Sequence, residues 1–158
     1  MNFETAFHKL LGHEGGFVSH PRDPGGATNW GVTERVARAN GYTGDMRELP
    51  VDFAKMVYRK DYWDAVRAEE LPPQIRYAVF DAAVNSGVGT SVRWLQQAVG
   101  ATADGVLGPK TLAAIQEVHP DGLLRRMLAK RLTAMTSMSG WPSFSKGWAR
   151  RVATLLEM

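Results

Sequence analysis

The sequence contains no cysteine among its 158 residues. This absence excludes disulfide bonds, thiolate metal sites and a cysteine nucleophile, and a reducing or an oxidising compartment would suit the chain equally. The four histidines, His8, His13, His20 and His119, lack the paired spacing of a zinc site, and the HExxH motif is missing. A Gly-x-Ser-x-Gly elbow and a Gly-Lys-Ser/Thr phosphate loop are also missing. We expect neither a metal nor a cofactor.

Long apolar runs are absent too. No stretch reaches the roughly 18 consecutive apolar residues of a membrane-spanning helix. The first residues, Met1 to His8, include an early acid and lack the basic region and apolar region of a signal peptide. We therefore expect the protein to be made in the cytoplasm without a signal peptide, so that any target outside it must be reached by a separate route.

Positive charge is concentrated towards the C-terminus, although the formal net charge is only +3. The clustered basic residues are Arg125, Arg126, Lys130 and Arg131, followed by Lys146, Arg150 and Arg151. One interpretation is that they lie on solvated faces of amphipathic helices. Another is that residues 121–136 and 143–157 contact an anionic membrane or wall polymer. No motif that reads nucleic acid is recognisable, and we expect no nucleic-acid partner.

Apolar residues recur at helical spacing along most of the chain, and alternation with period two is essentially confined to residues 16–33. Five glycines with Pro21 and Pro24, between Gly15 and Gly31, predict a shaped loop or a short β-hairpin there. The remaining pattern predicts seven or eight helices. The first helix is expected to run from Phe3 to near Gly15-Gly16. Other helices are expected to be capped at their N-termini by Thr33, Asp52 and Asp121, or to begin at Pro72-Pro73 and Gly108-Pro109. One helix is expected to end at Gly100. Expected core residues include Phe53, Met56, Val57, Trp63, Phe80 and Val84, with a stripe of Phe144, Trp148, Val152, Leu155 and Leu156 on the last helix.

Glu14 is the strongest candidate for a catalytic residue. It falls at the expected C-terminal end of the first helix, beside aromatic neighbours and the negative end of the helix dipole, and both features should raise its pKa. A glycosidase needs a protonated acid of this kind to donate a proton to the leaving glycosidic oxygen. The following Gly15 and Gly16 leave room for a sugar ring. Taken alone, a Glu before two glycines is more often a solvated helix end.

Asp23 and Thr28 lie in the glycine-rich segment that follows. A solvated loop carboxylate should stay ionised, and two carboxyl groups with pKa values pushed apart form the acid–base pair of glycoside hydrolysis. In that interpretation Asp23 helps to hold or activate a water, and the Thr28 hydroxyl positions it. Alternatively Asp23 only initiates a turn before Pro24-Gly25, and Thr28 is an ordinary loop residue.

The run from Glu14 to Thr33, EGGF…PRDPGGATNWGVT, resembles the signature of glycoside hydrolase family 108, a family of muramidases found in phage endolysins and a few bacterial secretion loci. The order of Glu14, Asp23 and Thr28 also resembles that of phage-type lysozymes, whose last spacing is usually one residue longer. The resemblance implies that Glu14 is the catalytic acid and gives Asp23 and Thr28 secondary roles. It also implies a mainly α, lysozyme-like fold, with a short loop or β-hairpin lining the active-site cleft.

Several polar and aromatic residues are candidate contacts for a saccharide. Trp30 lies in the glycine-rich segment, and Tyr58 and Tyr62 belong to an aromatic cluster; flat aromatic faces stack on the apolar side of a pyranose. Helical spacing equally predicts that the cluster packs in the core. Asn85, in a second segment that resembles the family, is a candidate for binding an N-acetyl group, although structural capping is an alternative.

Residues from about Val88 resemble the helical peptidoglycan-binding segment that usually follows this catalytic domain. The similar stretches are WLQQAVG from Trp94 and ADGVLGPKT from Ala103. Local structure explains much of the second stretch, because Asp104-Gly105 predicts a turn and Gly108-Pro109 a helix start. We predict a catalytic domain over residues 1–88 and a peptidoglycan-binding segment over 89–158, packed on it.

The resemblance implies a monomeric enzyme that hydrolyses the β-1,4 bond between N-acetylmuramic acid and N-acetylglucosamine in peptidoglycan. A phage endolysin that reaches the wall in the periplasm through a holin pore, or a secretion-linked bacterial enzyme, fits the missing signal peptide. Two alternatives stay open at this point: an endopeptidase that cuts the stem peptide, and a wall-binding protein with an inactive site.

Overall fold

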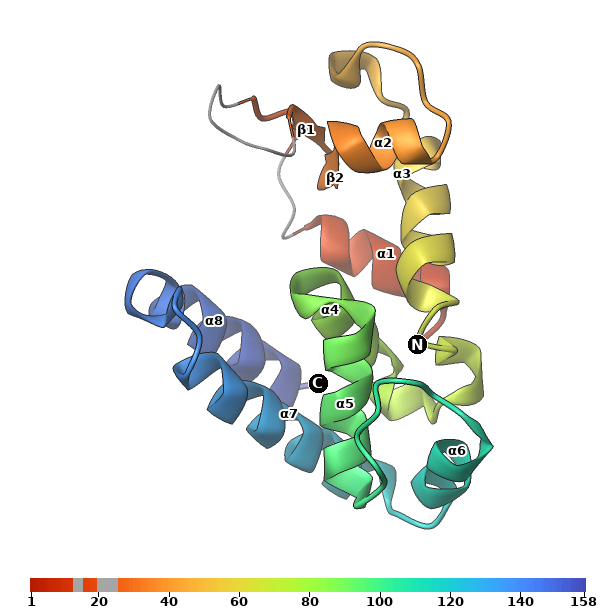
Figure 1. The fold of residues 1–158 in the computed structure, drawn as a ribbon, viewed down its shortest axis with the longest axis vertical. Coiled ribbons are helices and arrows are strands. Elements are labelled where there is room, and N and C mark those ends of the chain that lie inside the picture. Colours follow the sequence, from red (N-terminus) through yellow and green to blue (C-terminus); the bar gives the residue numbers. More distant parts are fainter. Residues whose placement is uncertain (13–15, 20–25) are drawn as a thin grey trace. The chain divides into compact units, whose positions relative to one another are not determined.

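Helices dominate this computed structural model, which describes residues 1–12, 16–19 and 26–158 (Figure 1). The predicted mainly α fold with a short β-hairpin is confirmed. The α-helices are α1 (Phe3–Leu11), α2 (Glu34–Ala39), α3 (Val51–Tyr58), α4 (Pro73–Ser86), α5 (Val88–Val99), α6 (Pro109–Gln116), α7 (Pro120–Thr136) and α8 (Trp141–Leu156). The strands are β1 (Thr28–Asn29) and β2 (Val32–Thr33), and short turns are η1 (Met46–Glu48), η2 (Arg59–Trp63) and η3 (Ala68–Glu70). No helix in the described ranges is long and apolar enough to cross a membrane.

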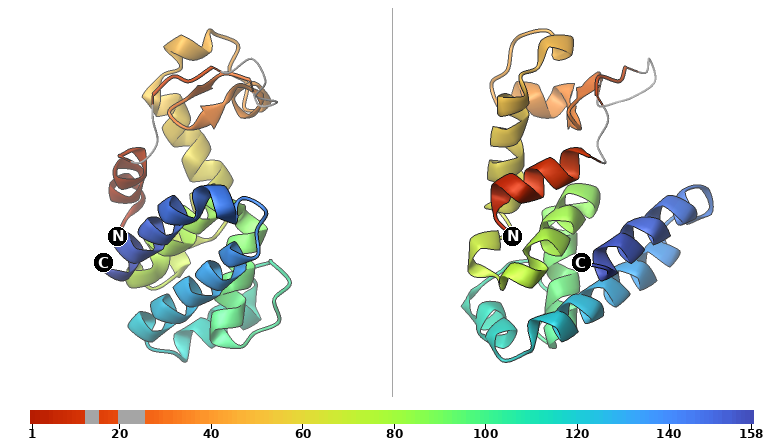
Figure 2. Two further views of the ribbon diagram at one scale, coloured as in Figure 1. Left: turned by 90° about the vertical axis from the view of Figure 1, so that its left-hand side faces the viewer. Right: turned by 180° about the vertical axis from the view of Figure 1, so that it is seen from behind.

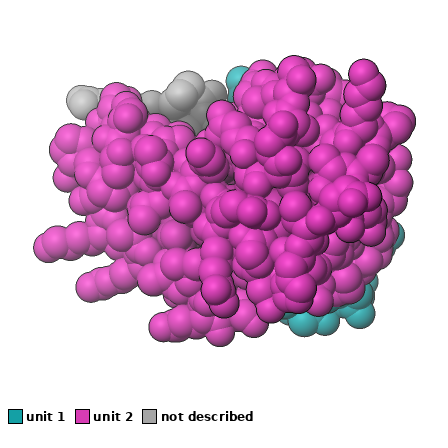
Figure 3. Space-filling view, turned by 90° about the horizontal axis from the view of Figure 1, so that it is seen from below, with its two compact units in different colours: residues 1–65 teal, residues 66–158 magenta. Residues whose placement is uncertain are grey.

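The chain divides into two compact units, Met1–Ala65 and Val66–Met158, which are coloured separately in Figure 3. Helix α4 belongs to the second unit because it packs chiefly against α5 and α7. The boundary of the units therefore precedes the boundary at residue 88 that the sequence predicts for the two domains. A compact unit and a domain defined by sequence similarity need not have the same boundaries. The predicted domain division therefore stays a prediction.

The first unit has an aromatic core. Phe7 contacts both Phe3 and Tyr58, with ring centroids 5.8 and 5.6 Å apart. Trp63 packs edge-on against Phe3 at 5.6 Å and is fully buried, so its predicted core position is confirmed. A π-helical turn, η2, carries the chain from the end of α3 to Trp63.

Helix α3 differs from its sequence-based description in two ways. The predicted cap at Asp52 is wrong, because the helix begins at Val51 after Pro50, and Asp52 lies within the first turn. Met56 is 41% exposed, so its predicted core position is wrong too. The buried face consists of Ala54, Val57 and Tyr58, because the aromatic core of this unit lies against that side of the helix.

The second unit is built around α4, which is buried on nearly all sides. Ile75, Val79 and Phe80 are fully buried, which confirms the predicted core position of Phe80. Val84, near the helix end, is only half-buried. Helix α4 begins at Pro73 and ends at Ser86 with Gly87 as its C-cap, and α5 ends at Val99 with Gly100, at φ 74°, as its C-cap. The glycine is required there because residues with a side chain rarely adopt this left-handed conformation. The start at Pro73 and the stop at Gly100 confirm the sequence-based prediction.

The loop between α5 and α6 is held by Asp104. Its Oδ1 accepts hydrogen bonds from the Val106 backbone N–H at 2.9 Å and from Gln96 Nε2 at 2.8 Å. These bonds, led by the one from Val106, lower the pKa of Asp104. Gly105 has φ 80°, so the predicted Asp104-Gly105 turn is confirmed.

Helices α7 and α8 lie side by side as a helical hairpin within this unit (Figures 1 and 2). Helix α7 begins at Pro120 after His119, so the predicted cap at Asp121 is wrong. Val152 and Leu155 are buried, but Phe144 is 60% and Leu156 is 52% exposed. The predicted stripe on α8 is thus only partly in the core, because its partner helix covers one section of that face.

The interior of this unit also contains an ion cluster that the sequence did not reveal. The Asp81 carboxylate accepts a hydrogen bond from Arg131 at 2.7 Å and from Arg151 at 2.9 Å, and Arg131 is fully buried. Burial lowers the pKa of Arg131, and the nearby Asp81 charge opposes this shift. Two of the basic residues that the sequence placed on solvated or ligand-binding helix faces therefore neutralise an interior carboxylate instead.

Candidate functional site

Of the three predicted catalytic residues, the structure describes only one. Glu14 and Asp23 lie outside the described residues, whereas Thr28 is half-buried in strand β1. Helix α1 is capped by Asn2, whose side chain accepts from the Thr5 backbone N–H at 3.0 Å, and it ends at Leu11 with Gly12 as its C-cap. The predicted helix end near Gly15-Gly16 is therefore wrong. The described part of the site is therefore the framework on either side of the predicted catalytic residues.

Thr28 has a firmly held backbone. Its N–H donates to the Val18 carbonyl and its carbonyl accepts from the Val18 N–H, both at 2.7 Å. Next to this pair of hydrogen bonds, the Glu34 N–H donates to the Ala27 carbonyl at 2.7 Å. These bonds hold together the two ends of the segment that contains Asp23, and they fix Thr28 in place.

The predicted β-hairpin is confirmed, with Thr28 paired to Thr33 and Asn29 to Val32. Its turn consists of Trp30 and Gly31, with φ 52° and 75°. A two-residue turn of type I′ requires positive φ at both positions, so that it matches the twist of the strands. Thr33 ends the hairpin and caps α2, as predicted, because its hydroxyl accepts from the Val36 N–H at 3.3 Å.

Trp30 is a bulky residue in the left-handed region, which costs free energy and needs support from its surroundings. Its Nε1 donates to the Leu49 carbonyl at 2.9 Å, and its own carbonyl accepts from the Tyr58 hydroxyl at 3.1 Å. The ring is half-buried. The structure therefore gives Trp30 an anchoring role in the hairpin, and its predicted contact with a sugar stays a prediction.

Asn29 is a further anchor that the sequence did not single out. Its side chain is buried, and its Nδ2 donates to the Met46 carbonyl at 2.8 Å and to the Arg47 carbonyl at 3.3 Å. An anchor of this kind cannot be identified from the sequence alone, because its partners are distant along the chain and no local pattern indicates it.

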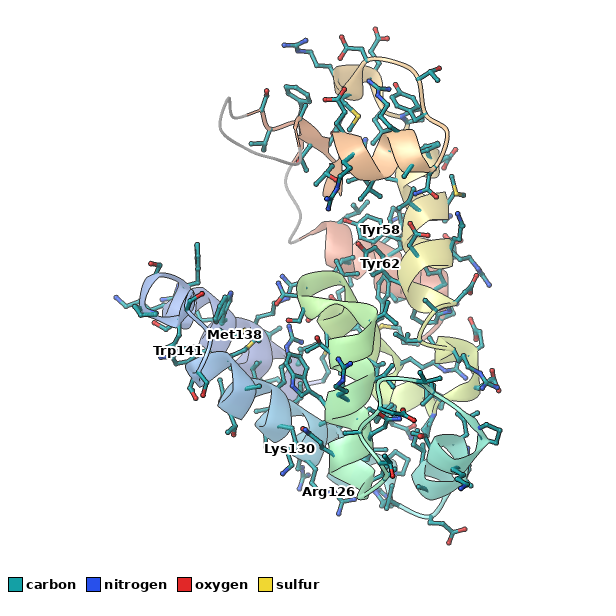
Figure 4. The ribbon with its side chains drawn as sticks, in the orientation of Figure 1. Tyr58, Tyr62, Arg126, Lys130, Met138 and Trp141 are labelled. Atoms are coloured by element: carbon teal, nitrogen blue, oxygen red, sulfur yellow. The ribbon has the colours of Figure 1, made fainter. Side chains whose placement is uncertain are left out.

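The two candidate tyrosines lie next to each other, with ring centroids 5.8 Å apart (Figure 4). Tyr58 is only 2% exposed, so its ring has almost no free face for a saccharide. Its burial agrees with the core alternative, and the predicted sugar contact of Tyr58 stays a prediction. Tyr62 is half-buried, and its predicted role stays a prediction.

A hollow of about 310 Å³ opens beside the hairpin in the first unit. Its walls include Phe17, Glu34, Arg38 and Arg47. The Arg47 guanidinium lies over the Phe17 ring at 5.1 Å from the centroid, and Arg38 forms an ion pair with Glu34 at 2.9 Å. An aromatic face among polar groups is suited to a hydroxyl-rich ligand. Phe17 and Arg47 are therefore candidate contacts that the sequence reasoning missed, although Phe17 directly follows the two glycines.

Asn85 lies in the second unit, at the exposed end of α4. Its Oδ1 accepts a hydrogen bond from Arg131 Nη2 at 3.4 Å, and its predicted contact with an N-acetyl group stays a prediction. In the described ranges no group of three or more histidine or acidic side chains could hold a metal ion.

Comparisons with known proteins agree with this framework. Residues 7–87 match the glycosyl hydrolase 108 family, and residues 90–153 match a family described as a "Predicted Peptidoglycan domain". The chain is also similar to the solved structure of SagA from Brucella abortus, at 34% identity over 98% of this chain and 91% of that one, with a TM-score of 0.88. No curated protein matches the chain.

Together, the helical fold, the hairpin and these matches define a lysozyme-like glycoside hydrolase that acts on peptidoglycan. The chain belongs to the glycosyl hydrolase 108 family, and the order of the two matched families is the one that the sequence predicts.

Proposed function

We propose that this protein is a muramidase, which hydrolyses the β-1,4 bond between N-acetylmuramic acid and N-acetylglucosamine with Glu14 as the general acid. The observation that carries the proposal is the family match over residues 7–87, which contains the whole run from Glu14 to Thr33. The backbone bonds between Thr28 and Val18 support it as well, since they hold Thr28 in place.

In this mechanism the Glu14 carboxyl protonates the leaving glycosidic oxygen while a water attacks the anomeric carbon. Asp23 holds or activates the water, and the Thr28 hydroxyl orients it. The proton of the water passes to the basic carboxylate, so that acid and base exchange their protonation states in each turnover. The fixed backbone of Thr28 supports its role, because a positioning hydroxyl must be held in place before the substrate arrives.

The test is the release of reducing sugar from purified peptidoglycan by the wild type and by Glu14→Gln. We expect at least a ~100-fold loss, because the amide keeps the shape of the side chain but has no acidic proton to donate. Glu117→Gln, at an exposed helix end, is the matched control and should keep full activity. New amines in place of new reducing ends would identify an endopeptidase, and no product from the wild type would identify a wall-binding protein without activity.

We further propose that the protein is a phage endolysin, which is made in the cytoplasm and reaches the wall through a holin pore. The expected result is that production in a bacterial host causes lysis only when a holin is produced with it. Lysis without a holin would contradict this route.

A second proposal concerns a basic surface of the α7–α8 hairpin, formed by Arg125, Arg126, Lys130, Lys146 and Arg150. All five are exposed, and within the described ranges none of them forms an ion pair with an acid. Arg126 and Lys130 are one helical turn apart on α7 (Figure 4), as are Lys146 and Arg150 on α8. Like charges at this spacing destabilise a helix. An anionic partner, either wall polymer or membrane lipid, would offset that cost.

A further inference from the structure

A second hollow, of about 280 Å³, lies within the Val66–Met158 unit. We call it the α8 pocket. Its lining residues come from three places that are far apart in the sequence: the end of α4, the start of α5, and the α7–α8 hairpin. They are Asn85, Ser86, Thr90, Met135, Met138 and Trp148.

The α8 pocket has a polar wall and an apolar wall. Asn85 brings an amide, and Ser86 and Thr90 bring hydroxyl groups. The two methionine side chains and the indole of Trp148 bring apolar surface. None of the described lining residues carries a charge. A pyranose ring has the same division, with an apolar face that stacks on aromatic rings and a rim of hydroxyl groups that form hydrogen bonds.

The indole of Trp148 packs against two other aromatic rings. The Phe144 ring stacks on it at 5.9 Å between centroids, and the Trp141 ring lies at 6.2 Å. At Gly140 a Cβ atom would be 3.1 Å from both Phe144 Cδ2 and Trp148 Cη2, so a side chain at this turn would require the two rings to shift by a few tenths of an ångström. Figure 4 shows Met138 and Trp141 at this end of the hairpin. A pocket wall that is ordered before binding lowers the entropy cost of binding a ligand.

We propose that the α8 pocket binds one neutral N-acetylhexosamine unit of the glycan strand, which rests on the proposed function in that it takes peptidoglycan as the substrate. The size favours a single sugar unit, since 280 Å³ is close to the lower end of the roughly 300–1,000 Å³ of small-molecule sites. The Asn85 amide can both donate to and accept from an acetamide. The acetyl methyl group then contacts Met138, because Met135 is only 1% exposed. The match of residues 90–153 to the peptidoglycan-domain family includes four of the six lining residues.

The experiment uses the full chain with Glu14→Gln, so that the glycan is not cut, and ¹³C-methyl methionine NMR as a local readout. The probe is the N-acetylglucosamine trimer. We expect saturable shifts of the Met135 and Met138 methyl signals, while the Met56 signal, which belongs to an exposed residue of the first unit, stays in place. Shifts that are absent at saturating trimer would overturn the proposal.

Two variants test the pocket itself. Thr90→Phe fills it and should weaken the affinity reported by the two methionine signals at least fivefold, whereas the matched control Thr133→Phe, on the exposed side of α7, should leave it unchanged. Asn85→Ala opens the pocket instead of filling it and should weaken the affinity about threefold. This second variant keeps the proposal testable if Thr90→Phe does not fold. Equal affinity in Asn85→Ala and in the parent chain would contradict the role of the amide and overturn the proposal.

The outcome is separable from that of the muramidase proposal. Reducing sugar released by the wild type without any shift of Met135 and Met138 would overturn the α8 pocket alone. Shifts without released sugar would support the pocket and contradict the muramidase activity. Shifts with a stem-peptide probe, and none with the sugar trimer, would replace the sugar by the peptide as the occupant and overturn this proposal.

Discussion

The Asp81 carboxylate lies between two guanidinium groups, Arg131 at 2.7 Å and Arg151 at 2.8 Å. Asp81 and Arg131 are almost fully buried. A buried charge is tolerated only when an opposite charge and hydrogen bonds compensate for its lost hydration. One carboxylate therefore stabilises two cations, and α4, α7 and α8 are joined through a single side chain.

We expect Asp81→Asn to be strongly destabilising, because it keeps the shape of the side chain and leaves Arg131 as an uncompensated interior charge. Breaking a buried ion pair from one side costs about 3–5 kcal/mol, which lowers the melting temperature of a chain of this size by about 6 °C or more. Thermal and urea unfolding measure the change. Asp121→Asn, at an exposed position of α7, is the control and should cost less than about 1 kcal/mol. A loss below 1 kcal/mol for Asp81→Asn would contradict this account of the cluster.

Among the elements, the β-hairpin of Thr28–Thr33 is the one that links the sequence motif to the site. It has only two residues in each strand, and a hairpin of this length is not stable by itself. Its stability comes from side-chain bonds to other elements of its unit, made by Asn29, Trp30 and Tyr58. A change that weakens these bonds should therefore alter activity more than overall stability.

Tyr58→Phe tests this expectation, because it removes the hydroxyl that donates to the Trp30 carbonyl and keeps the buried ring. We expect a loss of about 1 kcal/mol in stability and a several-fold loss of reducing-sugar release. The matched control is Tyr42→Phe, whose hydroxyl donates to the Asp45 carbonyl at 2.7 Å in the same unit but outside the hairpin. It should cost similar stability and keep the activity. Equal activity in the two variants would show that the Tyr58 bond does not position the hairpin.

At the scale of the whole molecule, charge is the property that distinguishes one part of the surface. The basic surface of α7 and α8 carries five cations that have no ion-pair partner among the described residues, on a chain with a formal net charge of +3. Exposed cations of this kind accelerate the encounter with an anionic polymer. Salt weakens the attraction, which is largely screened beyond about 10 Å at 0.1 M ionic strength.

We expect the double variant Arg126→Gln with Lys130→Gln to slow lysis of whole cells at low salt by several-fold, and to show a weaker dependence on salt than the wild type. The control, Arg35→Gln with Lys110→Gln, removes the same charge from exposed positions elsewhere and should behave as the wild type. Turbidity clearing over a series of salt concentrations measures both. A larger loss on whole cells than on purified wall would assign the surface to the membrane, and equal losses would assign it to the wall. No difference from the control would contradict the proposal.

By itself, the sequence determined most of the helices, the hairpin, the Thr33 cap and the family, because periodicity, turn residues and an ordered motif are local signals. Tertiary structure decided which side of each helix is covered. Met56, Phe144 and Leu156 follow an apolar pattern and are exposed, whereas Arg131 interrupts one and is fully buried. The physical reason is distance along the chain: Asp81 meets its two arginines 50 and 70 residues away, and the α8 pocket joins residues 85–90 to 135–148. Burial and charge compensation depend on such distant partners, and no local pattern contains them.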